Sequence, residues 1–333
     1  MPLLLTRADI DGLLPMSAVI EAVERAHADL SRGTAVQPTP STLSLEAGGP
    51  CFLPMAALAE RQQLAVVKVL ADVPANRDRG LAPQRSIVVL ISHQTGECVA
   101  ILDGMLLTRQ RTAAASAVAS RHLARPDSSV LGLVGAGGLA AAHVEAMIEV
   151  LPIRRVLVWS RSAATLELFV NRARVQFPLL EIRGAASPRE VVATADVVCT
   201  LTPSKEPIVQ GEWFAPGLHL NAVGAPPRAD HREIDSRAVS RAKVFVDSID
   251  VALHDSGDLK LAIADGAMVQ GQSIVEIGDV IIGRSAGRTH RDEITLFNSV
   301  GVAVQDLATA QLVVDAARRA GVGTEFDFAR SKA

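Results

Sequence analysis

The segment LGLVGAGGLAAAHVEAM (residues 131–147) joins a short apolar run to a glycine-rich turn and then to a pattern typical of a helix. Gly135, Gly137 and Ala140 fit the motif G-x-G-x-x-A. In a strand–turn–helix unit the first glycine permits a tight turn, the second lets the backbone approach a pyrophosphate, and the small third residue allows close helix packing. We therefore expect Gly135, Ala136, Gly137 and Gly138 to hold a dinucleotide pyrophosphate, assisted by the helix dipole.

The second strand of this unit, RRVLVWSRS (154–162), carries a different signal at its end. A carboxylate at this place would accept a hydrogen bond from the ribose 2′-hydroxyl of NAD. This chain has Ser160, Arg161 and Ser162 instead. An arginine can bind a 2′-phosphate through charge-assisted, bidentate hydrogen bonds. The sequence thus predicts NADPH as cofactor, with NADH as the weaker alternative, unless Arg161 is only a solvated surface residue.

Strands and helices alternate on both sides of this unit, which is typical of a parallel, doubly wound sheet. We expect a Rossmann-type domain over residues 123–304. Residues 64–73 and 86–104 have the character of paired strands, and residues 17–32 and the last thirty residues that of helices. The predicted fold class is α/β, with the Rossmann sheet inserted in a discontinuous α+β domain made of residues 1–122 and 305–333.

Composition limits the possible functions. The chain of 333 residues has a formal net charge of -3, 3% aromatic residues and no tyrosine, which argues against a nucleic-acid-binding surface. Its three cysteines are far apart, so neither a disulfide framework nor a metal site is expected. The start of the chain lacks the pattern of a signal peptide, and no apolar run is long enough for a membrane span. A cytoplasmic location is the simplest expectation.

Several segments together resemble the ornithine cyclodeaminase/μ-crystallin family over nearly the whole chain. They are VVKVL (66–70), ILDGMLLTRQRTAAASAVA (101–119), GLHLNAVGA (217–225), KVFVDS (243–248), EIGDVIIGRSAGR (276–288) and DEITLFNSVGVAVQDLATA (292–310). The resemblance implies a dimerising substrate domain and a Rossmann domain. It also implies hydride transfer between a nicotinamide and a carbon that carries both nitrogen and a carboxylate. Cyclodeaminases, ketimine reductases and amino-acid dehydrogenases share this redox step.

The resemblance also implies site residues. The substrate lysine and arginine of the family fall on Lys68 and Arg111, which could fix a carboxylate, and Lys68 could serve as an acid if its pKa is lowered. Candidates for cofactor contact are Thr112, Thr200, Val223 and Gly301.

The chain departs from the family in its substrate-binding segments. A further arginine often present near the N-terminus is replaced by Ser41, so Ser41 or Arg85 would compensate as a substrate-binding group. The threonine often found in a later segment is also missing, since Pro83 is the residue nearest that place.

A third departure concerns the aspartate of the cyclodeaminases. In VGAPPRADHREID (223–235), Pro226 stands near its expected place, and Asp230 is displaced along the chain. Together with Arg161, this favours NADPH-dependent reduction of Δ1-pyrroline-2-carboxylate to L-proline, or of Δ1-piperideine-2-carboxylate to L-pipecolate. Three alternatives stay open: an ornithine cyclodeaminase that uses NAD, another amino-acid dehydrogenase such as alanine dehydrogenase, and a non-catalytic NADPH-binding protein. Asp230 also remains a candidate substrate-binding residue, and a homodimer is expected.

Overall fold

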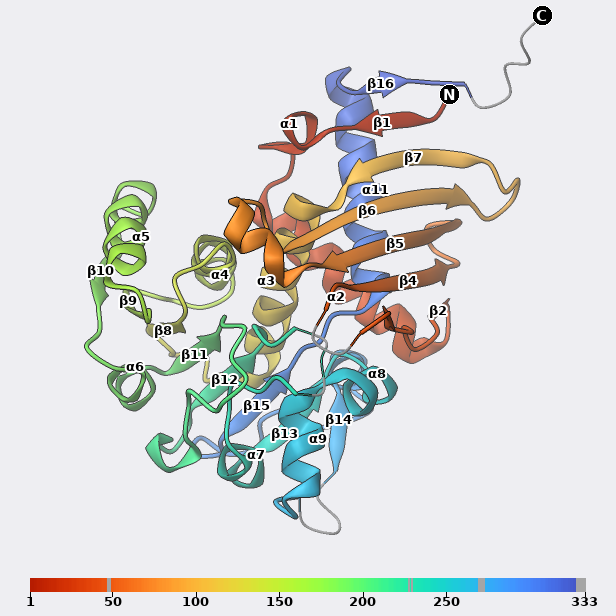
Figure 1. Ribbon diagram of the computed structural model, residues 1–333. Helices are drawn as coiled ribbons and strands as arrows, with labels where there is room; N and C mark the ends of the chain where they lie inside the picture. The colour runs from red at the N-terminus through yellow and green to blue at the C-terminus, as the bar shows by residue number, and fades with distance from the viewer. Residues whose placement is uncertain (47–48, 227, 229, 269–272, 328–333) are drawn as a thin grey trace, which may run out of the picture. The chain divides into compact units, whose positions relative to one another are not determined.

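The computed structural model describes residues 1–46, 49–226, 228, 230–268 and 273–327. The chain divides into two compact units (Figure 1): unit 1 is Met1–Arg111 with Val302–Ala333, and unit 2 is Thr112–Gly301. The first division lies inside helix α3 (Gly104–Leu123), which continues from one unit into the other. A continuous helix gives no local signal of such a division, whereas the sequence-based boundary at residue 122 follows the change of composition at the helix end.

Unit 1 contains a mixed sheet. Its strands follow the order β16-β1-β7-β6-β5-β4-β2, and β3 pairs with β4. The central strands β4 to β7 are antiparallel neighbours, whereas β1 runs parallel to β7. The strands are β1 (Leu3–Leu5), β2 (Ala35–Val36), β3 (Leu43–Ser44), β4 (Cys51–Ala59), β5 (Leu64–Asp72), β6 (Gln84–Ser92), β7 (Cys98–Asp103) and β16 (Thr324–Glu325).

Helices cover one face of this sheet. The long helix α11 (Ala303–Ala320) packs on β4, β5 and β6, and α2 (Met16–Arg32) packs on α11 (Figure 1). Gly33, with φ of 77°, ends α2 in the left-handed conformation that favours glycine. The short elements α1 (Arg7–Ile10) and η1 (Pro74–Arg79), a 3-10 helix, complete the unit.

The strands of unit 1 are apolar on both faces. In β5, Val66 and Leu70 point to the buried face, while Val67 and Val69 point to the other face and are exposed. Exposed apolar residues recur on other strands of the sheet, among them Leu4 on β1, Phe52 on β4 and Ile87 on β6. Lys68 lies between Val66 and Leu70 on the buried face, where alternation leads one to expect an apolar residue.

Unit 2 is a Rossmann-type parallel sheet, as predicted. Its strand order is β10-β9-β8-β11-β12-β15-β13-β14. After β8 the chain adds β9 and β10 on one side of this strand, and it then adds β11 on the other side. The strand order therefore reverses between β8 and β11, and sheets of this type bind ligands at such a switch point. The strands are β8 (Val130–Val134), β9 (Arg155–Trp159), β10 (Glu181–Gly184), β11 (Val197–Thr200), β12 (His219–Ala222), β13 (Lys243–Val246), β14 (Ile274–Glu276) and β15 (Thr295–Asn298).

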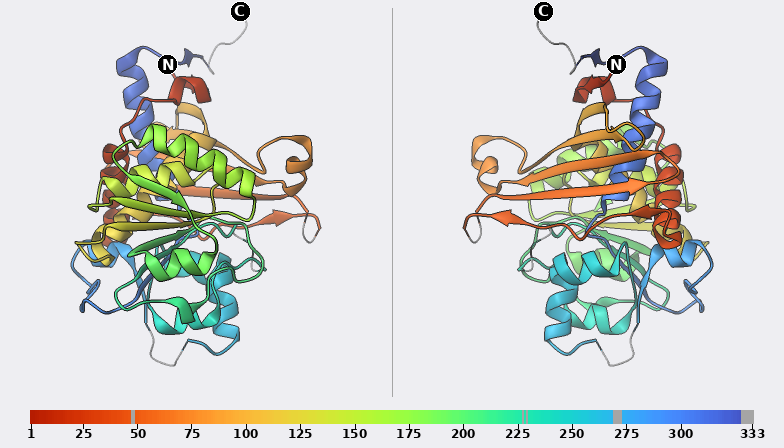
Figure 2. Two further views of the ribbon diagram at one scale, coloured as in Figure 1. Left: turned by 90° about the vertical axis from the view of Figure 1, so that its left-hand side faces the viewer. Right: turned by 90° about the vertical axis from the view of Figure 1, so that its right-hand side faces the viewer.

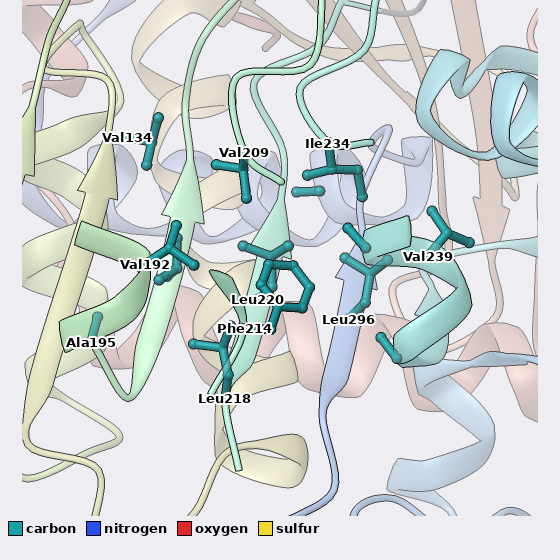
Figure 3. Packing of buried hydrophobic residues seen from close by; sticks show 14 of the residues in the cluster. Val134, Val192, Ala195, Val209, Phe214, Leu218, Leu220, Ile234, Val239 and Leu296 are labelled. Carbon is teal, nitrogen blue, oxygen red and sulfur yellow. The ribbon is translucent and has the colours of Figure 1, made fainter. Parts of the chain in front are cut away.

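Helices cover both faces of the parallel sheet (Figure 2). Val134 belongs to one apolar cluster, with Val192 and Leu220 (Figure 3), and Leu133 to a second cluster on the opposite face. The helical elements after α3 are α4 (Ala140–Ile148), α5 (Ala163–Gln176), α6 (Pro188–Thr194), η2 (Gly211–Trp213), α7 (Ser236–Arg241), α8 (Ile249–Asp255), α9 (Gly257–Ala264) and α10 (Ile277–Ile281). Among the described residues, none of the helices combines the length and apolar character needed to cross a membrane.

Candidate active site

A buried group of charged side chains lies in unit 1. Lys68 from β5 and Arg111 from α3 both contact Asp306, which lies in the first turn of α11. Asp306 Oδ1 accepts hydrogen bonds from Lys68 Nζ at 3.0 Å and from Arg111 Nε at 3.1 Å. The structure thus brings together the two substrate cations that the resemblance implied, and it adds a carboxylate between them.

Two further side chains complete this group. Arg111 Nη1 donates to Gln305 Oε1 at 2.9 Å, and Gln305 Nε2 donates to His27 Nε2 at 3.0 Å. His27 comes from α2. Burial, followed by the positive charge of Arg111, lowers the pKa of His27 to about 4, so its imidazole is neutral at physiological pH. His27 therefore adds no charge and orients Gln305 as a hydrogen-bond acceptor.

The charges in this group do not cancel. Lys68 and Arg111 are two cations, and Asp306 is the one anion that they share. Burial lowers the pKa of Lys68 to about 8, while Asp306 opposes that effect. Lys68 is thus charged at neutral pH, and the group has one net positive charge. Since an uncompensated buried charge is costly, the group is suited to a singly charged anion such as a carboxylate.

Two buried polar atoms of the group, Asp306 Oδ2 and His27 Nδ1, have no hydrogen-bond partner among the described residues. Asp306 Oδ2 is buried and accepts no hydrogen bond. Arg111 uses Nε and Nη1 within the group, which leaves Nη2 available as a donor. A ligand with an anionic end and an N–H group could bind Arg111 Nη2 and Asp306 Oδ2, since buried polar groups are normally hydrogen-bonded.

Ser41 and Arg85 do not join this group in unit 1. Arg85 lies at the start of β6 and is exposed, with its side chain on the face of the sheet opposite to Lys68 by strand alternation. Ser41 is exposed in the segment between β2 and β3. Their role in substrate binding stays a prediction.

The glycine turn after β8 fits a pyrophosphate. Gly135 has φ of 122°, and a Cβ there would lie 2.8 Å from the carbonyl oxygen of Leu201, so only glycine is accommodated without strain. Gly137 and Gly138 are exposed, and a Cβ on Gly137 would meet no atom within 4 Å. The packing of the protein itself therefore does not require a glycine at position 137, and its contact with a pyrophosphate stays a prediction.

The three residues after β9 lie at the next loop of the same sheet edge. Arg161 is exposed and has no ion-pair partner among the described residues. Ser162 caps α5, since its hydroxyl accepts a hydrogen bond from Thr165 N at 3.2 Å. Ser160 is half-buried. The side chain of Arg161 is thus exposed at this loop, and its role in binding a phosphate stays a prediction.

Four other candidates for cofactor contact lie at different depths. Thr112 is buried in α3, and Val223 follows β12. The hydroxyl of Thr200, at the end of β11, donates to Glu233 Oε2 at 2.7 Å and is therefore not free. Gly301 follows β15, has φ of 84° and donates its backbone N–H to Asp247 Oδ2 at 2.7 Å. The ends of β11, β12 and β15 share one sheet edge because these strands are parallel.

Asp230 lies in unit 2, in the segment after β12. It accepts hydrogen bonds from Lys205 Nζ and His231 Nδ1, both at 2.9 Å. These bonds lower its pKa to about 2, so Asp230 is ionised and poorly suited to donate a proton. Pro227 and Ala229, which flank this place, lie outside the described residues.

Sequence reasoning missed Asp306, Gln305, His27 and Glu233 as functional candidates. Asp306 could have been noticed because it is a carboxylate within the apolar pattern of α11, in which Val304, Leu307 and Ala310 are buried as well. His27 likewise lies among apolar residues on the buried face of α2. Such signals do not say which distant residue is the partner.

Comparisons with known proteins show the family of the chain. A model of the ornithine cyclodeaminase/mu-crystallin family matches residues 1–321. The ketimine reductase mu-crystallin of Mus musculus is 34% identical over 308 residues, which are 92% of this chain and 94% of the relative.

Two solved structures are similar throughout. Delta(1)-pyrroline-2-carboxylate reductase of Thermococcus litoralis, in complex with NADH and L-proline, has a TM-score of 0.94 and 35% identity, covering 97% of this chain and all of the other. An archaeal alanine dehydrogenase dimer with bound NAD has a TM-score of 0.91 and 31% identity, covering 98% of this chain and 99% of the other.

Proposed function

The chain belongs to the ornithine cyclodeaminase/mu-crystallin family, and from this premise we propose that it is an NAD(P)H-dependent oxidoreductase of C=N bonds. In its finer form, the proposed activity is NADPH-dependent reduction of cyclic 2-imino carboxylates. The substrates would be Δ1-pyrroline-2-carboxylate, giving L-proline, and Δ1-piperideine-2-carboxylate, giving L-pipecolate. The observation that supports this most directly is the buried group of Lys68, Arg111 and Asp306, whose net positive charge suits one carboxylate.

The residues of unit 1 have distinct tasks in this proposal. Arg111 and Lys68 bind the substrate carboxylate and fix the plane of the ring. Lys68, with a pKa of about 8, holds a proton at Nζ at neutral pH and is suited to donate it. The unpartnered Oδ2 of Asp306 is available to accept a hydrogen bond from a protonated imine nitrogen. Such a bond favours the iminium form, in which the ring carbon is electrophilic.

Unit 2 would hold the nicotinamide nucleotide. Gly135, Ala136, Gly137 and Gly138 would bind its pyrophosphate, and the ends of β11, β12 and β15 would position its nicotinamide. When bound, the cofactor supplies the hydrogen and the two electrons that reduce the C=N bond. Arg161 would bind the 2′-phosphate, which supports NADPH over NADH, although the compared structures contain NADH or NAD.

A second copy of the chain is the partner that we propose for unit 1. The outward face of its sheet carries exposed apolar residues on β1, β4, β5 and β6, and such a surface is typical of an interface. The compared alanine dehydrogenase is a dimer. Light scattering during size-exclusion chromatography should give the mass of a homodimer, and a monomer at micromolar concentration would contradict this assignment.

Absorbance at 340 nm tests the activity. NADPH and NADH should each be followed with both cyclic imines, and we expect turnover with NADPH to exceed that with NADH. Ammonia released from ornithine without added nucleotide would instead indicate a cyclodeaminase. Oxidation of NADPH with pyruvate and ammonia alone would indicate alanine dehydrogenase, and nucleotide binding without any turnover would indicate a non-catalytic binder.

A further inference from the structure

Glu233 is a buried carboxylate that joins two loops at the edge of the sheet where we place the cofactor. We propose that Glu233 is a positioning residue for the nicotinamide nucleotide, and that it acts by fixing the loops after β11 and β12. The inference rests on the proposed function, since it takes a nicotinamide nucleotide as the ligand. Glu233 itself is fully buried in unit 2, so it acts through the residues that it binds.

Both oxygens of Glu233 are fully used. Its Oε2 accepts hydrogen bonds from Thr200 Oγ1 and Gly224 N, each at 2.7 Å. Its Oε1 accepts from Thr202 N and Thr202 Oγ1, each at 2.6 Å. Two of these four donors, Thr202 N and Gly224 N, are backbone N–H groups, which can donate a hydrogen bond but cannot accept one. Only the ionised carboxylate, which carries no proton of its own, can accept all four bonds.

These loops are in direct backbone contact. A Cβ on Gly224 would lie 2.1 Å from Thr202 N, so the two loops pack without room for any side chain. The loop after β11 also abuts the glycine turn, because Leu201 O lies 2.8 Å from the Cβ position of Gly135. A shift of residues 201–202 would therefore move the pyrophosphate turn and the loop after β12 together.

The backbone of Glu233 is anchored in turn. Its N–H donates to Asp258 Oδ1 at 2.7 Å, and its carbonyl accepts from Ile208 N and Val209 N. Asp258 Oδ2 accepts from Asn298 Nδ2, at the end of β15, at 3.3 Å. Glu233 thus lies in a buried network that reaches the end of β11, the loops after β11 and β12, and the end of β15. Thr200 is the last residue of β11, and Val223 and Gly301 follow β12 and β15.

The charge of Glu233 depends on pH near neutrality. Burial, followed by the negative charge of Asp258 on α9, raises the pKa of Glu233 to about 7. Cys199 on β11 also interacts with Glu233, and burial raises the pKa of Cys199 to about 12, so that it stays neutral. The four hydrogen bonds that Glu233 accepts, which we call the Glu233 clamp, should all form above pH 7, where the carboxylate is ionised. They should weaken as pH falls below 7 and Glu233 becomes protonated. Cofactor affinity should follow the same course.

The experiment compares full-length wild type with Glu233→Gln and a matched control, Asp196→Asn. Asp196 also joins chain segments through hydrogen bonds that its carboxylate accepts, but it lies at the amino end of β11, away from the carboxyl ends where we place the cofactor. It accepts from Ser129 N at 2.9 Å, from Val130 N at 3.0 Å and from Arg125 Nη2. Fluorescence titration would give the Kd for NADH at pH 6, 7 and 8, and Tm would be measured without nucleotide. NADH is chosen because it lacks the 2′-phosphate, which itself titrates near pH 6.

We expect Glu233→Gln to raise the Kd for NADH about tenfold at pH 8 and to abolish its change between pH 6 and 8. Asp196→Asn should lower Tm and leave the Kd unchanged. If Glu233→Gln lowers Tm and keeps the wild-type Kd and pH profile, Glu233 is merely structural and the inference is overturned. If wild type itself binds neither NADH nor NADPH, the proposed function fails first.

A second variant covers the case in which Glu233→Gln does not fold. Thr202→Val removes one hydroxyl donor to Oε1 and keeps the carboxylate and the backbone bond. It should raise the Kd for NADH several-fold at pH 8, with a smaller change in Tm than Asp196→Asn causes. An unchanged Kd in folded Thr202→Val would overturn the inference.

Discussion

Replacing Lys68 with methionine should leave the protein at least as stable as wild type and should nevertheless weaken substrate binding. Methionine keeps an unbranched side chain of similar length without a charge. Asp306 and Arg111 then remain as a balanced buried pair. The substrate carboxylate loses one of its two cations, so the KM for the cyclic imine should rise and kcat should fall. Stability and activity are thus expected to move in opposite directions.

The magnitude follows from the pKa of the buried lysine. Burial lowers this pKa from 10.5 to about 8, even though Asp306 lies beside it. One pKa unit corresponds to about 1.36 kcal/mol, so holding Lys68 charged costs the folded state roughly 3 kcal/mol at neutral pH. The folded-state pKa lies below the unfolded one, so this penalty is complete below pH 8. It declines as pH rises from 8 to 10.5 and then vanishes.

Urea denaturation of the two proteins at pH 7, 8, 9 and 10 measures this effect. At pH 7 we expect Lys68→Met to be more stable by up to roughly 3 kcal/mol, with a difference that shrinks toward pH 10. Arg25→Met serves as control, because Arg25 forms an exposed i,i+4 ion pair with Glu21 that contributes little. The reasoning is wrong if Lys68→Met is less stable at pH 7 by more than about 1 kcal/mol. It is also wrong if the difference does not change with pH.

Three further predictions concern the cofactor turn, the cofactor preference and the buried carboxylate. Gly137→Ala should keep the Tm of the free protein and raise the Kd for NADPH tenfold or more. Gly135→Ala should instead lower the free energy of unfolding by about 1–3 kcal/mol, because the backbone at Gly135 is left-handed and an added Cβ would meet Leu201. An unchanged Kd for Gly137→Ala would exclude that glycine from the pyrophosphate site. Arg161→Asp should reduce the ratio of kcat/KM for NADPH to that for NADH by roughly 10–100-fold, since a hydrogen bond to a charged group contributes about 1.5–3 kcal/mol. A ratio that does not move would show that Arg161 is only a surface cation. Asp306→Asn should lose about 3–5 kcal/mol of stability at pH 7, because two buried cations lose their shared counter-charge. Urea denaturation that gives a loss below about 1 kcal/mol would contradict this charge balance.

Local patterns in the sequence were sufficient to predict the Rossmann sheet. Apolar runs such as Val130–Val134 form strands, and the glycine turn at Gly135 follows at once. Each of these patterns spans only a few consecutive residues, so it can be recognised in the sequence without knowledge of the fold. The division between the two units was less accessible, because it lies within the continuous helix α3.

The site was predictable only in part. Lys68 and Arg111 could be named because the family resemblance marks them, whereas residue type alone would suggest a strand residue and a surface cation. The role of Asp306 depends on a contact with Lys68 across 238 residues, which no local pattern contains. Glu233 was hidden for a different reason: its importance comes from four donors on two loops that meet only in the folded sheet.

The two ends of the chain build unit 1 together, and this has a consequence for synthesis on the ribosome. The sheet strands and Lys68 emerge early, but α11 emerges only after all of Thr112–Gly301 has been made. During that interval the apolar surface of β4, β5 and β6 that α11 later covers is exposed in the nascent chain, and Lys68 lacks the carboxylate of Asp306. We expect chaperones to act on this intermediate. A product truncated before Ala303 would contain Thr112–Gly301 but would lack Asp306, the carboxylate that Lys68 and Arg111 share.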